Sequence, residues 1–190
     1  MKQTVQSLLG ACSVMVVIDP PRQVAGKILA EGRRLRRSVI WHPGVLTRFG
    51  IKEFEDEMEG LDYLVLNEVE ASRFTKTRGL ENSLASISRR SPKARILVTL
   101  GSKGAAFYEK GNLSKVENVQ LEKLGKKVIN TTGCGDAFVG AFAAYKILGR
   151  TDKEALRYAN MAGALKATRA ETRGSPSKKE LEDASRKYFA

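Results

Sequence analysis

Several features that would place this chain in a special class of protein are scarce in its 190 residues. Two cysteines, Cys12 and Cys134, are too few for a disulfide framework, and free thiols in the cytoplasm are the simplest interpretation. The longest apolar stretches, such as Val14–Ile18 and Ala141–Tyr145, fall far short of the roughly 20 residues of a membrane span. Proline is also rare, and neither an internal repeat nor a low-complexity segment is present. We therefore expect a cytoplasmic protein with no membrane partner.

What is present is typical of an ordinary folded protein. Hydrophobic residues make up 42% of the chain, alongside 17 glycines, which excludes the composition of a disordered segment. The length suffices for one domain with a sizeable core and is short for two. We therefore expect a single domain over residues 1–190.

Acidic residues are outnumbered, 21 against 33 basic ones, so the formal net charge is +12. Nucleic-acid binding is one interpretation of this charge. However, the basic groups are scattered, and none is interleaved with aromatic side chains that could stack on bases. They lie at Arg33–Arg37, Arg89–Arg95, Lys123–Lys127 and Lys166–Arg173. The charge therefore favours a small anionic substrate such as a nucleoside triphosphate, and nucleic acid remains the weaker alternative.

Short apolar runs alternate with amphipathic segments in the first half of the chain, which is typical of parallel strands joined by helices. We expect strands at Val14–Ile18, Val39–Trp41, Tyr63–Leu66 and Ile96–Leu100. We expect helices at Gln23–Leu35 and Glu53–Leu61, from about Asn67, and around Leu80–Ser88. The order predicts an α/β fold with a mainly parallel sheet flanked by helices on both faces.

The pattern changes after Gly101. Ala105–Tyr108 and Leu113–Val119 are separated by a tight turn, which predicts a β-meander. The last third is helical, and two pairs there fit a capping box, Thr151 with Glu154 and Ser177 with Glu180. The expected helices are Ala137–Leu148, Lys153–Thr168 and Lys178–Phe189.

The run Asn130–Asp136 is the strongest candidate for a functional site. An expected strand, Lys127–Ile129, enters a turn with two glycines, and an apolar helix leaves it. Backbone N–H groups and the positive end of the helix dipole would then point at one spot, which makes an anion site. Asp136 stands beside that spot, where it could take a proton from an attacking hydroxyl. The alternative role of Asp136 is a plain helix N-cap.

Ligands collect at the carboxyl ends of the strands in sheets of this kind. Asn67, Gly101 and Gly133 each follow an expected strand directly, so we expect their loops to gather at one edge. An anion site next to a base, with further loops around it, suits phosphoryl transfer.

Four segments together resemble the ribokinase/PfkB family of carbohydrate and nucleoside kinases. Thr131–Asp136 resembles the family signature usually written D-T-x-G-A-G-D, and Asn67–Glu70 resembles its N-x-x-E motif. Val98–Gly104 resembles the nucleotide-binding turn T-L-G-x-x-G, and Asn160 falls where a family side chain lies near the nucleotide. The resemblance runs from about Val14 to the end of the chain and implies a ribokinase-like fold that uses ATP and Mg²⁺.

The resemblance implies separate roles for the residues of the signature. Asp136 would be the general base for a sugar or nucleoside hydroxyl, and the backbone N–H groups of Gly133, Cys134 and Gly135 would form the anion hole. Cys134 stands where the family often has alanine. It is interpreted as an inert small residue, although its place at a helix N-terminus could lower the pKa of its thiol.

The remaining motifs would hold the nucleotide and the metal. Nucleotide contacts are implied for Asn67, Thr99, Gly101, Ser102, Lys103, Gly104, Thr131 and Asn160. Glu70 and Asn67 would organise magnesium-bound phosphate through water, since Mg²⁺ keeps most of its waters and binds few protein groups. The alternative is that Asn67 only caps a helix and that Glu70 and Lys103 are surface residues. His42, the lone histidine, is interpreted as a structural turn residue.

The chain departs from the family pattern in two places. Asn130 stands where the signature has aspartate, which in many relatives helps hold a monovalent cation, so this cation is doubtful here. The sugar-binding residues, an earlier glycine signature and a β-lid of the family have no counterpart in this sequence. We therefore expect weak or no kinase turnover by this chain alone, and a homo-oligomer or a partner chain over its exposed edge. A non-catalytic nucleotide-binding module is the alternative function.

Overall fold

The computed structural model describes residues 11–189, which divide into two compact units. The first unit comprises residues 11–98 and 106–114, and the second comprises residues 99–105 and 115–189.

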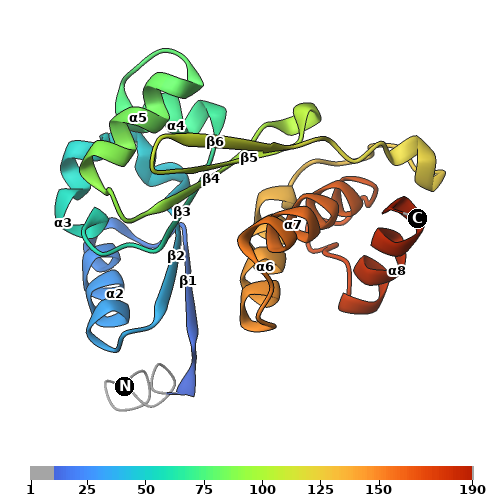
Figure 1. Ribbon diagram of the computed structural model, residues 1–190, viewed down its shortest axis with the longest axis horizontal. Helices are drawn as coiled ribbons and strands as arrows, with labels where there is room; N and C mark the ends of the chain where they lie inside the picture. The colour runs from blue at the N-terminus through green and yellow to red at the C-terminus, as the bar shows by residue number, and fades with distance from the viewer. Residues whose placement is uncertain (1–10, 190) are drawn as a thin grey trace. The chain divides into compact units, whose positions relative to one another are not determined.

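A six-stranded sheet, with its strands in sequence order, forms the framework of the first unit (Figure 1). Its strands are β1 (Val14–Ile18), β2 (Ser38–His42), β3 (Tyr63–Asn67), β4 (Arg95–Thr99), β5 (Ala105–Glu109) and β6 (Asn112–Val116). β1 pairs with β2 in parallel from Val14 opposite Ser38 to Ile18 opposite His42, and β2 pairs with β3 in parallel. The expected strands are therefore confirmed, with parallel pairing from β1 to β3 and with β5 and β6 as neighbours joined by a tight turn, in a sheet of mixed direction.

The middle strands are buried on both faces, whereas the outer strands are not. The central residues of β2, β3 and β4 are buried without interruption, as expected where both faces of a sheet are covered. Along β1 buried and accessible positions alternate, and Val16 and Ile18 are each 38% exposed. Most of β6 is accessible to solvent.

Helices join the strands of the first unit. They are α2 (Arg22–Arg34), η1 (Gly44–Phe49), η2 (Ile51–Phe54), α3 (Glu55–Met58), α4 (Glu68–Thr75) and α5 (Leu80–Arg90). The rings of Trp41, Phe54 and Phe74 form a buried cluster with centroids 5.5–6.1 Å apart. The predicted helix Glu53–Leu61 was wrong. The segment is divided between η2 and α3, because Phe54 leaves the helical conformation, with φ −134° and ψ 26°, while its ring is buried in this cluster.

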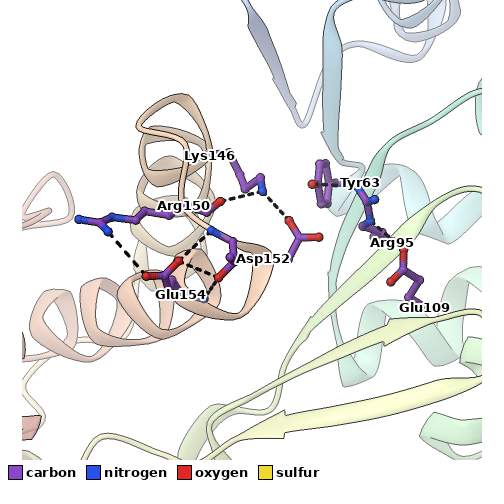
Figure 2. Close-up of polar contacts among 8 residues, drawn as sticks. Tyr63, Arg95, Glu109, Lys146, Arg150, Asp152 and Glu154 are labelled. Atoms are coloured by element: carbon purple, nitrogen blue, oxygen red, sulfur yellow. Dashed lines mark hydrogen bonds and ion pairs between the residues drawn. The ribbon is translucent and has the colours of Figure 1, made fainter.

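A polar cluster joins three strands of the first unit. The guanidinium of Arg95 on β4 donates to Glu109 on β5 at 2.8 Å and to the hydroxyl of Tyr63 on β3 at 3.0 Å (Figure 2). These contacts help to hold the ends of β3, β4 and β5 together.

Helices dominate the second unit, which contains η3 (Gly101–Lys103), η4 (Leu121–Leu124), α6 (Cys134–Ile147), α7 (Asp152–Ala167) and α8 (Lys178–Phe189). α6 packs along α7 (Figure 1). The rings of Tyr145 on α6 and Tyr158 on α7 stack with their centroids 3.8 Å apart. At the α6–α7 connection, Lys146 pairs with Asp152 at 2.7 Å and Arg150 with Glu154 at 3.7 Å (Figure 2).

Local sequence signals account for several of these boundaries. Both expected capping boxes form, at Thr151 with Glu154 and at Ser177 with Glu180. β6 ends at Val116, earlier than predicted, because the chain beyond it leaves the sheet. Within residues 11–189, no helix is long and apolar enough to cross a membrane.

Candidate functional site

The turn before α6 is shaped by a side chain and a glycine. The side-chain oxygen of Asn130 accepts the N–H of Thr132 at 2.9 Å, and its amide nitrogen donates to the carbonyl of Ala170 at 2.8 Å. Gly133 is the N-cap residue of α6 with φ +84°, and a Cβ there would lie 2.6 Å from the carbonyl oxygen of Thr172. Only glycine fits this position without strain.

The segment entering the turn is not a strand, which corrects the prediction for Lys127–Ile129. The backbone N–H groups of Ile129 and Asn130 both donate to the carbonyl of Ala167, at 2.7 and 3.0 Å. Ala167 is the last residue of α7, so its carbonyl has no partner within the helix. A helix end therefore holds this segment in place of a neighbouring strand.

The N-terminus of α6 offers fewer free donors than the sequence predicted. The N–H of Cys134 is engaged with the carbonyl of Thr131 at 3.2 Å. Among the described residues, the N–H groups of Gly133 and Gly135 have no such partner. The anion-binding capacity of this turn therefore rests on these two groups and on the helix dipole.

Asp136 lies in the first turn of α6 and is exposed. The alternative role as an N-cap was wrong, since Gly133 is the N-cap residue and no side chain caps this helix end. Within residues 11–189 the carboxylate of Asp136 has no hydrogen-bond or ion-pair partner. It is therefore free to accept a proton or a hydrogen bond from a ligand.

A cavity of about 420 Å³ lies in the second unit beside this turn. It brings together most of the residues expected to bind nucleotide, which come from two separate loops, from α6 and from α7. Those lining it are Thr99, Gly101, Ser102, Gly104, Thr131 and Asn160, together with Cys134 and Gly135 of the expected anion hole. The shared cavity supports the expected convergence of the loop at Gly101 with the turn at Gly133, whereas Asn67, the third member of that prediction, is not among the residues that line it.

Sequence reasoning missed the apolar walls of this cavity. They are formed by Val119, Leu121, Val128, Phe138, Ala164 and Ala167, with Asn118 and Gly163 beside them. One signal could have found part of this wall. Asn160, Gly163, Ala164 and Ala167 follow a helical spacing of three and four residues, so they share one face of α7.

Two of the residues expected to contact nucleotide, Lys103 and Asn160, differ in the structure from what that role alone would predict. Lys103 is exposed and is not among the residues that line the cavity. The amide of Asn160 donates to the carbonyl of Glu117 at 2.8 Å, so it also anchors α7 to the chain beyond β6. Gly104 is confined by space, because with φ +90° its Cβ would lie 2.1 Å from the carbonyl oxygen of Val116.

Asn67 and Glu70 belong to the first unit, where they form a complete capping box at the start of α4. The side chain of Asn67 accepts the N–H of Glu70 at 2.8 Å, and Glu70 accepts the N–H of Asn67 at 2.9 Å. The helix-cap interpretation of Asn67 is therefore correct. The second carboxylate oxygen of Glu70 has no partner among the described residues, which leaves it available to a metal-bound water.

That arrangement fits magnesium bound mainly by water and phosphate. Within residues 11–189, no group of three or more His, Cys, Asp or Glu side chains could hold a metal ion directly. Magnesium usually retains several waters and takes one or two carboxylates, so a single free carboxylate oxygen is compatible with it.

Cys134 is partly buried, and His42 contacts a backbone carbonyl. Burial raises the pKa of the Cys134 thiol, and the nearby charge of Lys166 opposes this rise without cancelling it. The proposed lowering of this pKa at the helix N-terminus was therefore wrong, because desolvation outweighs the charge. His42 lies 2.9 Å through Nδ1 from the carbonyl of Val65, as expected of a structural residue.

The known proteins that this chain resembles include carbohydrate and nucleoside kinases. The sequence pattern of the pfkB family of carbohydrate kinases matches residues 8–179. Ribokinase of Arabidopsis thaliana is 32% identical over 112 residues, covering 57% of this chain and 29% of the relative. Fructokinase-1 of Oryza sativa subsp. japonica is 28% identical over 152 residues, covering 76% of this chain and 44% of the relative.

Solved structures share the fold. Arabidopsis thaliana ribokinase in complex with ribose and ATP matches with a TM-score of 0.81 at 23% identity, over 96% of this chain and 59% of that one. The Burkholderia thailandensis nucleoside kinase in complex with inosine matches with a TM-score of 0.79 at 22% identity, over 95% of this chain and 60% of that one. The chain therefore has a ribokinase-like α/β fold and spans well under two thirds of each of these relatives.

Proposed function

Because the chain belongs to the pfkB family of carbohydrate kinases, we propose that it binds a nucleotide with Mg²⁺ and carries the phosphate-transferring residues of a sugar or nucleoside kinase. The observation that carries this proposal is the 420 Å³ cavity, to which the loop at Gly101 and the turn before α6 both contribute. ATP is the proposed phosphoryl donor, in keeping with the ribokinase that was solved with ribose and ATP.

The walls of the cavity suit the two ends of a nucleotide. Val119, Val128 and Ala164 form an apolar surface on which a flat base can be buried, since ligand pockets are mostly apolar with a few orienting polar groups. Gly135 lies at the N-terminus of α6, where the helix dipole and free N–H groups favour phosphate. We therefore place the base against α7 and the phosphates at α6.

In the proposed reaction, Asp136 accepts the proton of the acceptor hydroxyl as the hydroxyl oxygen bonds to the γ-phosphorus. The bond from that phosphorus to the bridging β-phosphate oxygen breaks, and ADP leaves. The N–H groups of Gly133 and Gly135 stabilise charge that develops on the phosphoryl oxygens. By analogy with oxyanion holes, each donor contributes about 3 kcal/mol to lowering the barrier.

Magnesium neutralises charge on the phosphates when it is bound. Glu70 would hold its water ligands through the free carboxylate oxygen, with Asn67 fixing the backbone at the start of α4. A protein assigned as a ribokinase II from E. coli was solved with ATP and Mg²⁺; it matches this chain with a TM-score of 0.79 at 20% identity.

Nucleotide binding is tested by filling the cavity. We expect Ala164→Leu to weaken the binding of ATP·Mg²⁺ and ADP·Mg²⁺ at least about tenfold, because a larger side chain occupies the apolar wall. The matched control is Ala144→Leu, the same change at an exposed position of α6. Isothermal titration calorimetry measures both variants. Equal affinities of wild type and Ala164→Leu would contradict the proposed site.

A non-catalytic nucleotide-binding module is the second candidate function. The cavity gathers residues expected to bind nucleotide, whereas no residue of this sequence was identified as an acceptor-binding residue, which favours binding without efficient transfer. We expect little phosphorylation of ribose, fructose or adenosine by this chain alone, measured as ADP release. Substantial turnover with any of these acceptors would exclude the module and support the kinase.

A further inference from the structure

Asn130 stands where the family resemblance implies an aspartate that helps to hold a monovalent cation, and its surroundings do not fit such an ion. Its amide nitrogen donates to the carbonyl of Ala170, and its side-chain oxygen accepts the N–H of Thr132. An aspartate at the same position would set a carboxylate oxygen against the Ala170 carbonyl with no hydrogen between them. A cation would relieve that repulsion, whereas asparagine supplies the hydrogen itself.

Lys166 of α7 already places a positive charge next to this turn. The side chain of Lys166 is fully buried, and its ammonium donates to the backbone carbonyl of Asn130 at 3.2 Å. A Cβ built on Gly133 would lie 3.4 Å from Cε of Lys166, so the end of this side chain lies directly beneath the turn. The ammonium therefore binds a backbone carbonyl of the kind that a metal cation would take as a ligand.

The charge of Lys166 is not balanced by the protein around it. Among residues 11–189, no carboxylate lies within ion-pair distance of its ammonium, and the Asn130 carbonyl is its one hydrogen-bond acceptor. A buried charge is costly unless it is paired or hydrogen-bonded. An anion bound at the adjacent N-terminus of α6 would supply the missing negative charge.

The effect of Lys166 extends to the first residue of α6. Its charge lowers the pKa of the Cys134 thiol, against the larger rise caused by burial. The same field acts on any phosphate beside Gly135, because Cys134 and Gly135 line the same cavity.

We propose that the Lys166 ammonium and the Asn130 amide replace a bound monovalent cation in this chain, so that its phosphate site works without K⁺. This inference rests on the proposed function for the identity of the anion. Lys166 is a positioning residue here, since it acts through the turn and does not line the cavity.

The first experiment compares cations at constant ionic strength. Calorimetric affinity for ATP·Mg²⁺ is measured in KCl and in N-methylglucamine chloride. Wild type is expected to bind equally in both, within about twofold. Lys166→Met is expected to bind at least about tenfold more weakly in both, whereas Lys166→Arg keeps the positive charge and is expected to lose less affinity than Lys166→Met. Lys153→Met, at an exposed position of the same helix, is the matched control and is expected to match wild type.

A double variant provides the positive test. Asn130→Asp/Lys166→Met restores the carboxylate and removes the ammonium, so K⁺ is expected to raise both its nucleotide affinity and its melting temperature. Thermal melts of wild type should be the same in the two salts. A K⁺-dependent gain in wild type, or unaltered binding by Lys166→Met, would overturn the inference.

A third measurement does not depend on nucleotide. In a Cys12→Ser background, the pH dependence of Cys134 alkylation reports the thiol pKa. Lys166→Met is expected to raise this pKa and Lys166→Arg to leave it near the wild-type value. An unchanged pKa would overturn the placement of the charge. If wild type bound neither ATP nor ADP, the proposed function would fail, and the thiol and melting data would still decide the role of Lys166.

Discussion

Individual residues of the turn before α6 meet different physical requirements. Gly133 is needed for its backbone conformation and for the space beside Thr172, whereas Asn130 is needed for two side-chain hydrogen bonds. Asp136 is needed neither for a special backbone conformation nor for a hydrogen bond, because its carboxylate has no partner among the described residues and does not cap the helix. Its charge complements the dipole of α6, but it makes no hydrogen bond or ion pair within the described residues, so it is the residue of this turn best explained by chemistry.

The role of Asp136 is therefore separable from nucleotide binding. We expect Asp136→Asn to abolish any phosphoryl transfer, because the amide cannot take the hydroxyl proton, and to leave ATP affinity nearly unchanged. Calorimetry and an ADP-release assay on the same preparation measure the two effects. A parallel loss of ATP binding would indicate a structural role for the carboxylate.

Gly133 is expected to be a stability determinant. Gly133→Ala forces a Cβ to within 2.6 Å of the Thr172 carbonyl oxygen at φ +84°. We expect it to lower the free energy of unfolding by about 1–3 kcal/mol, the usual cost of strained backbone. Gly140→Ala is the control, because that helical glycine has open space around it. If the turn can relax, urea unfolding followed by circular dichroism would give Gly133→Ala the same free energy of unfolding as wild type.

At the scale of elements, the packing of α6, α7 and α8 holds the wall of the cavity in place. Tyr145 on α6 stacks on Tyr158 of α7 and donates to Glu182 of α8 at 3.5 Å. Burial, and then the charge of Glu182, raises the pKa of the Tyr145 hydroxyl to about 12. The neutral tyrosine is thus the form that the packed helices accommodate.

This packing predicts a loss of stability at high pH. The pKa of Tyr145 is higher in the folded protein, about 12 against an unperturbed 10.0, so the unfolded state loses its proton first. The contribution of Tyr145 to stability is therefore complete below pH 10 and is lost as the pH rises toward 12. Urea unfolding at a series of alkaline pH values measures it. Tyr145→Phe is expected to flatten the decline, and an equally steep decline would contradict this assignment.

At the scale of the whole molecule, the net charge of +12 is spread along the chain in separate groups. Where described basic side chains meet aromatic rings, most lie over a single ring, as Arg48 does over Phe49 and Arg157 over Phe189. Such a surface attracts small anions without forming a nucleic-acid groove. A homo-oligomer or a partner chain over the accessible edge strand β1 stays a prediction, which sedimentation analysis would test.

The charge distribution predicts weak or no association with nucleic acid. Electrophoretic mobility shifts with single-stranded and duplex oligonucleotides at low salt should give no defined complex. Affinity for ATP·Mg²⁺ should fall only modestly as salt rises, because few phosphates are neutralised. Tight oligonucleotide binding with a steep inverse dependence on salt would instead favour a nucleic-acid-binding protein.

The sequence by itself determined the order of strands and helices, the two capping boxes at Thr151 and Ser177, and the glycine turn before α6. These features follow from periodicity and capping among residues only a few positions apart. Only the tertiary structure decided that a helix end replaces the strand before the turn and that apolar residues wall the cavity.

The clearest case is the pair formed by Asn130 and Lys166. The two residues are 36 positions apart, and no local pattern distinguishes Lys166 from the other basic residues near it. Its burial arises because α7 ends against the turn, where the ammonium meets the backbone carbonyl of Asn130. Contacts of this range depend on how helices pack, and packing exists only once the chain is folded.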